Sequence, residues 1–268
     1  LNPDRVIVGT DSERAWSVME RIYRPVARAG RPIIQTDVKS AEIIKYASNA
    51  FLATKISFIN EIANFCAIVG GNAKEVARGM GFDSRIGSRF LSAGIGFGGS
   101  CFPKDVKALL HTGHEHGYDF TILEAVRAAN EKQKLLPIGF LKKSLKTLKG
   151  KKIAVWGLSF KPRTDDVREA PSLLIIETLL KNGASVVAFD PVATENAKES
   201  LKSHPRLKFS RDQYAATDGA DALVVATEWD EFRTADFADL AKRMRGNVIV
   251  DGRNIFERDE AEAAGFTY

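Results

Sequence analysis

The chain has 268 residues, of which 44% are hydrophobic and 27% are charged, with a formal net charge of +5. This length and apolar content supply more than one packed core, so we expect two domains. The modest charge, with its signs interleaved, does not indicate nucleic-acid binding and suits small anions such as nucleotides. Polar residues interrupt the apolar stretches before the roughly 20 residues of a membrane span, and no signal-peptide pattern is present. We therefore expect a cytoplasmic protein with no membrane partner.

The two cysteines, Cys66 and Cys101, have surroundings too different to predict a disulfide framework. Cys66 lies in the apolar segment 62–68, where we interpret it as a small buried hydrophobic residue. Cys101 follows a glycine-rich segment, and it is the cysteine that calls for a chemical explanation.

The first third of the chain predicts a short strand over residues 1–9, a helix over about 12–28 and one long helix over 37–69. The long helix lacks Gly and Pro and is stopped by Gly70-Gly71. A strand so near the first residue has no visible partner. Either its partner is distant in the sequence, or the chain begins in the middle of a domain.

The middle of the chain is helical. Asn72 and Glu75 have the spacing of a helix N-cap with a reciprocal glutamate, so a short helix should start there and end near 79–81. A glycine-rich loop follows over 82–100, and Pro103 suits the first turn of the next helix. A further helical stretch runs over about 121–148, which Pro137 should kink or split.

From Gly150 onward strands alternate with helical stretches. Such alternation predicts an α/β fold with a parallel, doubly wound, Rossmann-like sheet. The predicted strands are 153–156, 185–189, 222–226 and 247–250, and the best-defined helix is 171–181.

Cys101 lies in the run Gly96-Phe97-Gly98-Gly99-Ser100-Cys101-Phe102-Pro103-Lys104-Asp105. The glycines allow the backbone to approach a ligand closely, while the helix start and Lys104 favour a nucleophilic thiolate. Asp105 is placed to hold a water or accept a proton. Spacing alone leaves open a glycine-rich connector in which Cys101 is merely small.

This run, together with Phe90-Leu91-Ser92-Ala93-Gly94, resembles the active-site segment of the UDP-glucose 6-dehydrogenases. The resemblance implies that Cys101 is the catalytic nucleophile and that Lys104 contacts the cofactor. It also implies substrate contacts by Phe90, Leu91, Ser92, Ala93, Gly94, Phe97 and Gly98.

A second segment, residues 41–51, is similar to the helix by which that family presents a lysine and an asparagine to the sugar. Lys45 and Asn49 are four residues apart, which places them on one helical face whatever the family. Alone, such a pair is most often a solvated strip. The segment 83–87 resembles the family segment whose arginine, here Arg85, crosses a dimer interface to the partner's substrate.

The second domain carries one glycine and a lysine in its first strand-to-helix turn, where an NAD-binding fold would carry G-x-G-x-x-G. We therefore do not expect NAD to bind in that turn. Residues 160–169 are similar to the family's UDP-binding turn, which implies substrate contacts by Phe160 and Lys161 and a cofactor contact by Arg168. Residues 251–254 resemble its second nucleotide contact, through Arg253.

Two further groups of residues have simpler explanations. His111, His114 and His116 lie with Glu115 between Gly113 and Gly117, where nothing orients three imidazoles together, and we expect no metal site. The seven-residue spacing of Phe51, Phe58 and Phe65 is explained by core or dimer packing.

The resemblance covers essentially the whole chain. It implies the tail of an N-terminal NAD-binding domain over 1–30, a helical domain over 31–120 that forms a homodimer, a connecting helix over 121–149 and a UDP-sugar-binding domain over 150–268. Most of the NAD-binding domain and a catalytic glutamate should precede Leu1, so we expect the chain alone to be inactive.

The implied reaction is the oxidation of UDP-glucose to UDP-glucuronate with two NAD molecules, through a thiohemiacetal and then a thioester on Cys101. Lys45 would stabilise negative charge on oxygen, and Asn49 and Asp105 would hold a water. Two alternatives stay open: a GDP-mannose or other UDP-sugar dehydrogenase, and a dimerising nucleotide-sugar-binding module without catalysis.

Overall fold

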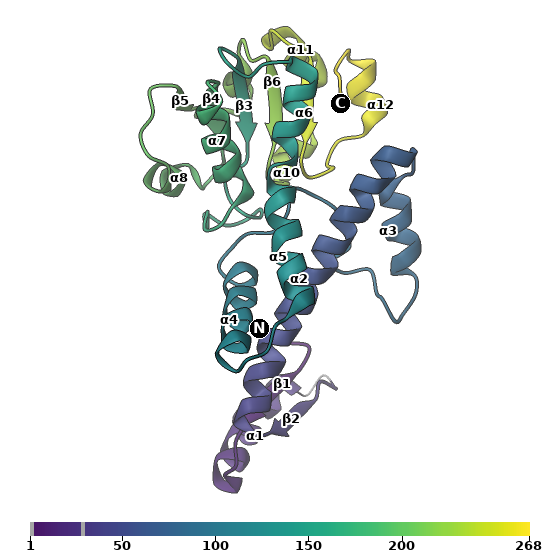
Figure 1. The fold of residues 1–268 in the computed structure, drawn as a ribbon, viewed down its shortest axis with the longest axis vertical. Coiled ribbons are helices and arrows are strands. Elements are labelled where there is room, and N and C mark those ends of the chain that lie inside the picture. Colours follow the sequence, from purple (N-terminus) through teal and green to yellow (C-terminus); the bar gives the residue numbers. More distant parts are fainter. Residues whose placement is uncertain (1–2, 28–29) are drawn as a thin grey trace.

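The structure is a computed structural model that describes residues 3–27 and 30–268. The molecule is elongated, with the N-terminal strands at one end and a parallel sheet at the other (Figure 1). Helix α2 (Val38–Val69) runs from the first end toward the second. The middle of the molecule, where α2 passes the helices that follow it, lies between these two ends.

The N-terminal end consists of β1 (Val6–Gly9), α1 (Glu13–Ala27) and β2 (Ile33–Thr36). Strand β1 pairs in parallel with β2, with Val6 opposite Ile33. The sequence analysis found no partner for β1, because Ile33–Thr36 is short and follows Gly30 and Pro32, which favour a loop. The predicted beginning of this strand and end of this helix, at residues 1–2 and 28, fall outside the described residues.

The long helix and its short successor are confirmed. The Asp37 carboxylate caps α2 by accepting from the Ser40 amide at 2.8 Å, and Gly70 ends the helix at φ +78°. Asn72 caps α3 (Ala73–Gly81) by accepting from the amides of Lys74 and Glu75.

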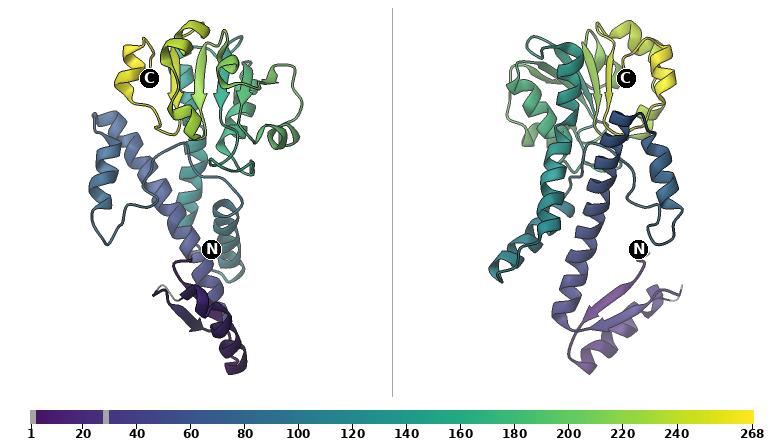
Figure 2. Two further views of the ribbon diagram at one scale, coloured as in Figure 1. Left: turned by 180° about the vertical axis from the view of Figure 1, so that it is seen from behind. Right: turned by 45° about the vertical axis from the view of Figure 1, so that its right-hand side comes forward.

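Three helices lead from the middle of the chain to the sheet. They are α4 (Phe102–Glu115), α5 (Thr121–Lys134) and α6 (Leu136–Leu145). Pro137 lies in the first turn of α6 and the break falls at Leu135, so the predicted split is confirmed. Helices α5 and α6 follow each other up to the sheet and join the two halves of the molecule (Figure 2).

The C-terminal half is a five-stranded parallel sheet of order β5-β4-β3-β6-β7, which confirms the predicted fold class. Strands β4 and β5 lie on one side of β3, and β6 and β7 lie on the other, so the strand order reverses between β3 and β6. Parallel sheets bind ligands in the crevice at the carboxyl ends of two such strands. The strands are β3 (Lys152–Trp156), β4 (Ser185–Phe189), β5 (Leu207–Phe209), β6 (Ala222–Val225) and β7 (Val248–Asp251). The sequence analysis did not identify β5, which has only three residues.

Both faces of this sheet are buried, because alternate side chains of each strand enter different cores. From β3, Ile153 and Val155 pack with α6 and α7 (Pro171–Lys181), while Ala154 and Trp156 pack on the opposite face. The first face also holds α8 (Thr194–Ser200). The second is covered by α9 (Gln213–Thr217), α10 (Asp230–Arg233), α11 (Phe237–Arg243) and α12 (Arg258–Ala263).

Among the described helices, α2 alone has the length and composition of a membrane span, with a mean hydropathy of 1.3 over its most apolar 18-residue window. The sequence alone had not indicated that this helix is long and apolar enough to span a membrane. In this structure α2 packs against α3, α4, α5 and β1. Phe51, Phe58 and Phe65 are exposed on it, so of the two explanations given for their spacing, core packing is wrong.

Candidate active site

The side chains of Lys45, Asn49 and Asp105 meet where α2 packs against α4. Asp105 is buried at 3% exposure and accepts from Lys45 Nζ at 3.2 Å and from Asn49 Nδ2 at 2.5 Å. A third donor, Lys104 Nζ, lies 2.6 Å from its other oxygen. Residues that the sequence places some 60 positions apart are therefore joined around one carboxylate.

Asp105 is a charged group in a buried position. Burial raises the pKa of its carboxyl, but the hydrogen bonds from Lys104, Lys45 and Asn49 outweigh burial and hold that pKa below its usual value. The carboxylate is therefore ionised near neutral pH. Its negative charge also raises the pKa of Lys104, chiefly through their hydrogen bond.

Cys101 is the N-cap residue of α4 and is exposed. Its carbonyl accepts from the Asp105 amide at 2.8 Å, and its sulfur lies 3.7 Å from the Ser100 hydroxyl. The pKa values of Lys104 and Arg168 are raised chiefly by their hydrogen bonds to Asp105 and Asp166, and to a lesser extent by Cys101. The exposed thiol thus lies at the start of a helix, four residues before the buried Asp105.

The glycines before Cys101 lack side chains where the loop over residues 160–170 of the sheet domain packs against them. A Cβ on Gly98 would lie 2.2 Å from the Glu169 carbonyl oxygen, and one on Gly99 would lie 2.6 Å from the Phe160 ring. The Gly99 amide donates to the Arg168 carbonyl at 2.8 Å. Residues 94–101, which we call the cysteine loop, are thus seated directly on the 160–170 loop.

The aromatic residues around Cys101 pack edge to face. The Phe102 ring lies 6.1 Å from that of Phe90 and 5.9 Å from that of Phe97. Phe90 has a positive φ of 65°, whereas the Phe97 ring is buried in the core between α2, α4 and α5. Of the other predicted substrate contacts in this segment, Leu91 is buried and Ser92 exposed.

Arg253 connects the cysteine loop to the ligand-binding edge of the sheet. It follows β7, and its guanidinium donates to the Ala226 carbonyl at 2.8 Å and lies 3.2 Å from Glu228. Longer contacts of 3.5 and 3.4 Å reach the carbonyls of Gly96 and Phe160. Burial lowers the pKa of Arg253, which still stays protonated because an arginine titrates far above neutral pH.

The remaining predicted residues of the sheet domain lie in the 160–170 loop. Lys161 Nζ lies 5.2 Å from the centre of the Phe160 ring, and Arg168 is held by Asp166 at 2.7 Å. Beside β7, the Tyr268 hydroxyl donates to Asp251 at 2.9 Å, and the Asp251 carboxylate also accepts from the Arg253 amide. The sequence analysis missed Tyr268.

Arg85 lies apart from this cluster. Its side chain is 87% exposed and pairs with Asp83 of the same loop at 2.6 Å. Within the described residues it has no hydrogen bond or ion pair to the cysteine loop or to α4. The histidines of α4 face separate acids: His111 lies 3.3 Å from Glu115, and His114 lies 3.3 Å from Asp119.

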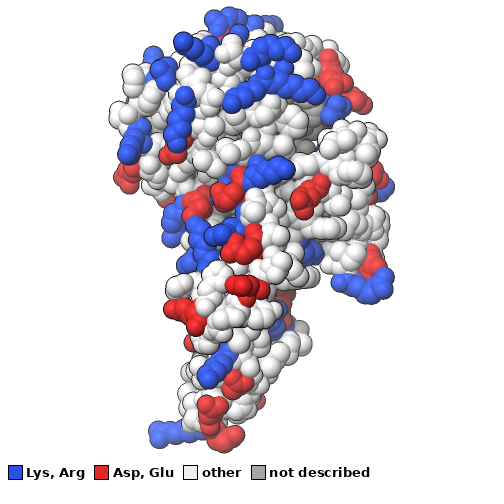
Figure 3. Space-filling model, viewed as in Figure 1, with Lys and Arg blue, Asp and Glu red and all other residues white. Residues whose placement is uncertain are grey.

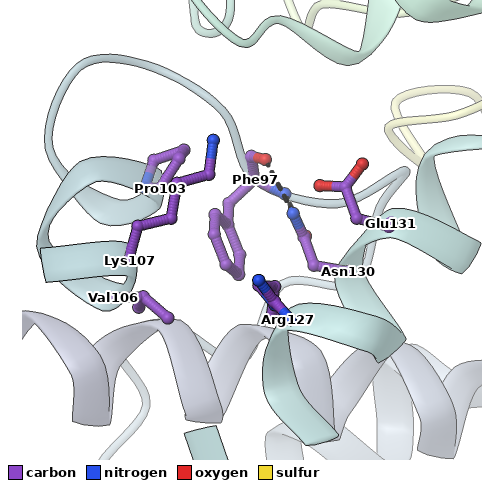
Figure 4. A pocket seen from close by; sticks show the side chains of 7 residues that line it. All are labelled: Phe97, Pro103, Val106, Lys107, Arg127, Asn130 and Glu131. Carbon is purple, nitrogen blue, oxygen red and sulfur yellow. Dashed lines mark hydrogen bonds between the residues drawn. The ribbon is translucent and has the colours of Figure 1, made fainter. Parts of the chain in front are cut away.

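A small pocket behind the cysteine loop is lined by Asn130, a residue that the sequence had not singled out (Figure 4). Asn130 of α5 faces the backbone of Phe97 across it. One turn further on, Gln133 bonds to Gly94. Two amides spaced three apart on an otherwise Ala- and Lys-rich helix are the signal that was available. The pocket is lined by Phe97, Pro103, Val106, Lys107, Arg127, Asn130 and Glu131.

The chain thus joins helices that present an exposed thiol to a parallel sheet, the arrangement of an α/β protein whose sheet can bind a ligand at its carboxyl edge. Residues 39–132 match the central domain of the UDP-glucose/GDP-mannose dehydrogenase family, and residues 154–258 match that family's UDP binding domain. The chain belongs to this family.

Individual relatives agree. A UDP-glucose 6-dehydrogenase of Bacillus subtilis is 46% identical over 268 residues, covering 100% of this chain and 57% of that protein. The solved UDP-glucose dehydrogenase of Pyrobaculum islandicum superposes with a TM-score of 0.87 at 37% identity, covering 95% of this chain and 56% of that one. The UDP-D-ManNAc dehydrogenase of Pyrococcus horikoshii gives 0.81 at 30% identity, with 94% and 56% covered. The chain thus spans somewhat more than half the length of these relatives.

Proposed function

We propose that this chain is the sugar-binding and thiol-bearing part of an NAD-dependent UDP-glucose 6-dehydrogenase, which oxidises UDP-glucose to UDP-glucuronate. The observation that carries the proposal is the placement of exposed Cys101 at the start of α4, beside the cluster of Lys45, Asn49, Lys104 and Asp105. Helix α2 and the start of α4, which are distant in the sequence, form this arrangement. Each contributes residues that suit the oxidation of an alcohol by way of a thiol adduct.

The thiolate of Cys101 is the nucleophile. The primary alcohol of the sugar first loses a hydride and its hydroxyl proton to become an aldehyde. The thiolate adds to the carbonyl carbon of this aldehyde, and the carbonyl oxygen takes a proton to complete a thiohemiacetal. Loss of a hydride and of the hydroxyl proton leaves a thioester, and water then adds to the thioester and releases the carboxylate and the thiol. Lys45, whose side chain is 62% exposed, stabilises negative charge on the substrate oxygen. Asn49 and Asp105 orient the water.

The nucleotide is expected at the carboxyl edge of the sheet, at the crevice beside β3 and β6. Phe160 and Arg253 contact the cysteine loop near that edge, and Lys161 lies beside the Phe160 ring, so a sugar linked to a nucleotide there would reach toward Cys101. Backbone of residues 90–94 and 97–98 would line the sugar. Arg85, which is exposed and pairs with Asp83, would have to leave that carboxylate to reach the site of a second copy.

NAD supplies the hydride acceptor when it is bound. Lys104 and Arg168 have side chains 67% and 69% exposed, so their charges suit the phosphates of a dinucleotide. Oxidation also requires a domain that holds the nicotinamide.

We also propose that the central helices form a homodimer in the cytoplasm. Helices α2 and α3 and the following loop expose Phe51, Phe58, Phe65, Ile68 and Phe82, with exposed fractions between 48% and 81%. So many large apolar side chains on adjoining elements are characteristic of an interaction surface.

The decisive experiment is Cys101→Ser in the full-length protein, with NADH formation and UDP-glucose affinity measured together. We expect turnover to fall at least a thousandfold, while affinity changes by less than threefold. Near-normal UDP-glucuronate formation would refute the role of Cys101. Comparing UDP-glucose, GDP-mannose and N-acetylated UDP-hexosamines as substrates tests the sugar. Sugar-nucleotide binding without NADH formation from any of them would favour a binding module.

A further inference from the structure

The cysteine loop is buried over residues 95–99 and has no regular secondary structure, so its peptide groups need partners from elsewhere. Amide side chains of α2 and α5 supply them. Asn60 Oδ1 accepts from the Gly94 amide at 2.8 Å, and Gln133 Nε2 donates to the Gly94 carbonyl at 2.7 Å. Asn130 bonds to both groups of Phe97.

The Asn130 contact is the most restrictive of these. Its Oδ1 accepts from the Phe97 amide at 2.8 Å and its Nδ2 donates to the Phe97 carbonyl at 3.1 Å, as the dashed lines in Figure 4 show. Two bonds to the N–H and C=O of one residue restrict both of its backbone dihedrals. Asn130 is only 2% exposed, so these bonds do not compete with bulk water.

The residues on either side leave this clamp no alternative geometry. Gly96 has φ +92°, and a Cβ there would lie 2.8 Å from Asn130 Oδ1. Beyond Phe97, Gly98 and Gly99 rest against Glu169 and Phe160. The backbone is thus held by α5 on one side and by the 160–170 loop on the other, and it then reaches Cys101 within two residues.

We propose that Asn130 is a positioning residue that fixes the cysteine loop through the peptide groups of Phe97 and thereby sets the location of Cys101. It acts through Phe97 and does not touch the substrate. This inference rests on the proposed function for its catalytic consequence, but its structural part concerns the chain alone.

The substitution Asn130→Asp distinguishes a positioning role from a packing role, because the aspartate side chain has the same shape as asparagine but different hydrogen-bonding groups. A carboxylate keeps the acceptor for the Phe97 amide but loses the donor, and it places negative charge against the Phe97 carbonyl. A protonated carboxyl restores the donor. The charged groups lining the same pocket are Lys107 of α4 and Arg127 and Glu131 of α5, and Glu169 of the neighbouring loop pairs with Lys107. The pKa of Glu169 is held low, chiefly by Lys107, so Glu169 stays charged throughout the measured range.

The test uses kcat of the full-length N130D protein, divided by kcat of the unsubstituted protein, from pH 5.5 to 8.5. We expect a ratio of about one tenth or less at pH 8.5 that rises at least threefold as the pH falls to 5.5. N182D is the matched control, because Asn182 Nδ2 also donates to a backbone carbonyl, that of Thr178 at 2.8 Å, far from the cysteine loop. Its ratio should stay near one.

Hydrogen exchange of the 94–101 peptide in the present chain provides the second readout. At pH 8 the exchange should be at least tenfold faster in N130D than in N182D. Unchanged exchange, or a loss of kcat that is the same at every pH, would overturn the proposal. If N130D does not fold, N130S removes both bonds and must show the same faster exchange. If the unsubstituted protein does not oxidise UDP-glucose, the proposed function fails, while the exchange measurement still decides the positioning role.

Discussion

Asn49 Nδ2 donates to the buried carboxylate of Asp105 at 2.5 Å, and this contact ties α2 to α4 next to Cys101. A carboxylate at 3% exposure is stable only with strong partners, and Asp105 has two lysines in addition to Asn49. The same group therefore organises the site and contributes to the stability of the helical domain.

We expect Asp105→Asn to lower the free energy of unfolding by about 2 kcal/mol, because an amide cannot accept from three donors in that geometry. The loss of unfolding free energy caused by Asp105→Asn should depend on pH. The pKa of Asp105 is lowered in the folded protein, so its stabilisation is present above the unfolded pKa of about 3.9 and is lost as the pH falls through the folded pKa.

Urea unfolding of both proteins between pH 7 and pH 2 measures this difference, and the two stabilities should converge at the acid end. A gap that stayed constant over the whole range would contradict the assignment of an ionised Asp105. Asp259→Asn on α12 is the control, because Asp259 is exposed and should contribute little at any pH.

Gly98→Ala should separate the cysteine loop from the sheet domain. The added Cβ would lie 2.2 Å from the Glu169 carbonyl oxygen, so backbone has to move. We expect a loss of about 1–3 kcal/mol in stability, as for overpacking in a dense interior. Gly79→Ala in α3 meets nothing within 4 Å and should stabilise by about 0.5–1 kcal/mol. Thermal denaturation of the two variants checks the opposite signs.

Glu169→Gln should weaken the contact between the helical domain and the 160–170 loop. Glu169 pairs with Lys107 at 2.8 Å and with the buried Lys134 at 3.6 Å, and it holds a positive φ of 53°. We expect a loss of about 2 kcal/mol, since Lys134 keeps only Glu131 as a partner. The measurement is chemical denaturation at low and high salt. Glu195→Gln, which breaks the exposed pair with Lys198, should cost less than about 0.5 kcal/mol.

Phe58→Asp tests the homodimer. Phe58 lies on α2 with 48% of its surface exposed, and a charge there would be buried in the proposed interface. We expect sedimentation to show a dimer for the unsubstituted protein and a monomer for the variant. Phe140→Asp on α6, where the side chain is 46% exposed, should leave the dimer intact. Identical sedimentation of all three proteins would refute this interface.

Local signals accounted for much of the fold. Several helix boundaries depend on hydrogen bonds or backbone geometry within a few residues, so the sequence predicted them. They are the boundaries at Asp37, Gly70, Asn72 and Pro137. Strand β5 was not found because three residues give too little periodicity, and β2 was not found because Gly30 and Pro32 before it favour a loop. The distribution of charge was not evident from the sequence: Lys and Arg side chains predominate over the visible face of the sheet end, while both signs mix over the helical part (Figure 3).

The sequence by itself determined the family resemblance and most of the longer helices and strands, and it singled out the residues that we propose carry the chemistry. Motifs such as Gly96–Asp105 have that power because their residue types serve backbone geometry and reactivity within one short segment. Only the tertiary structure decided that Lys45 and Asn49 meet Asp105, that Gly98 admits Glu169, and that Asn130 clamps Phe97. Those contacts span 33 to 71 positions, and they depend on how helices pack, which no local pattern specifies.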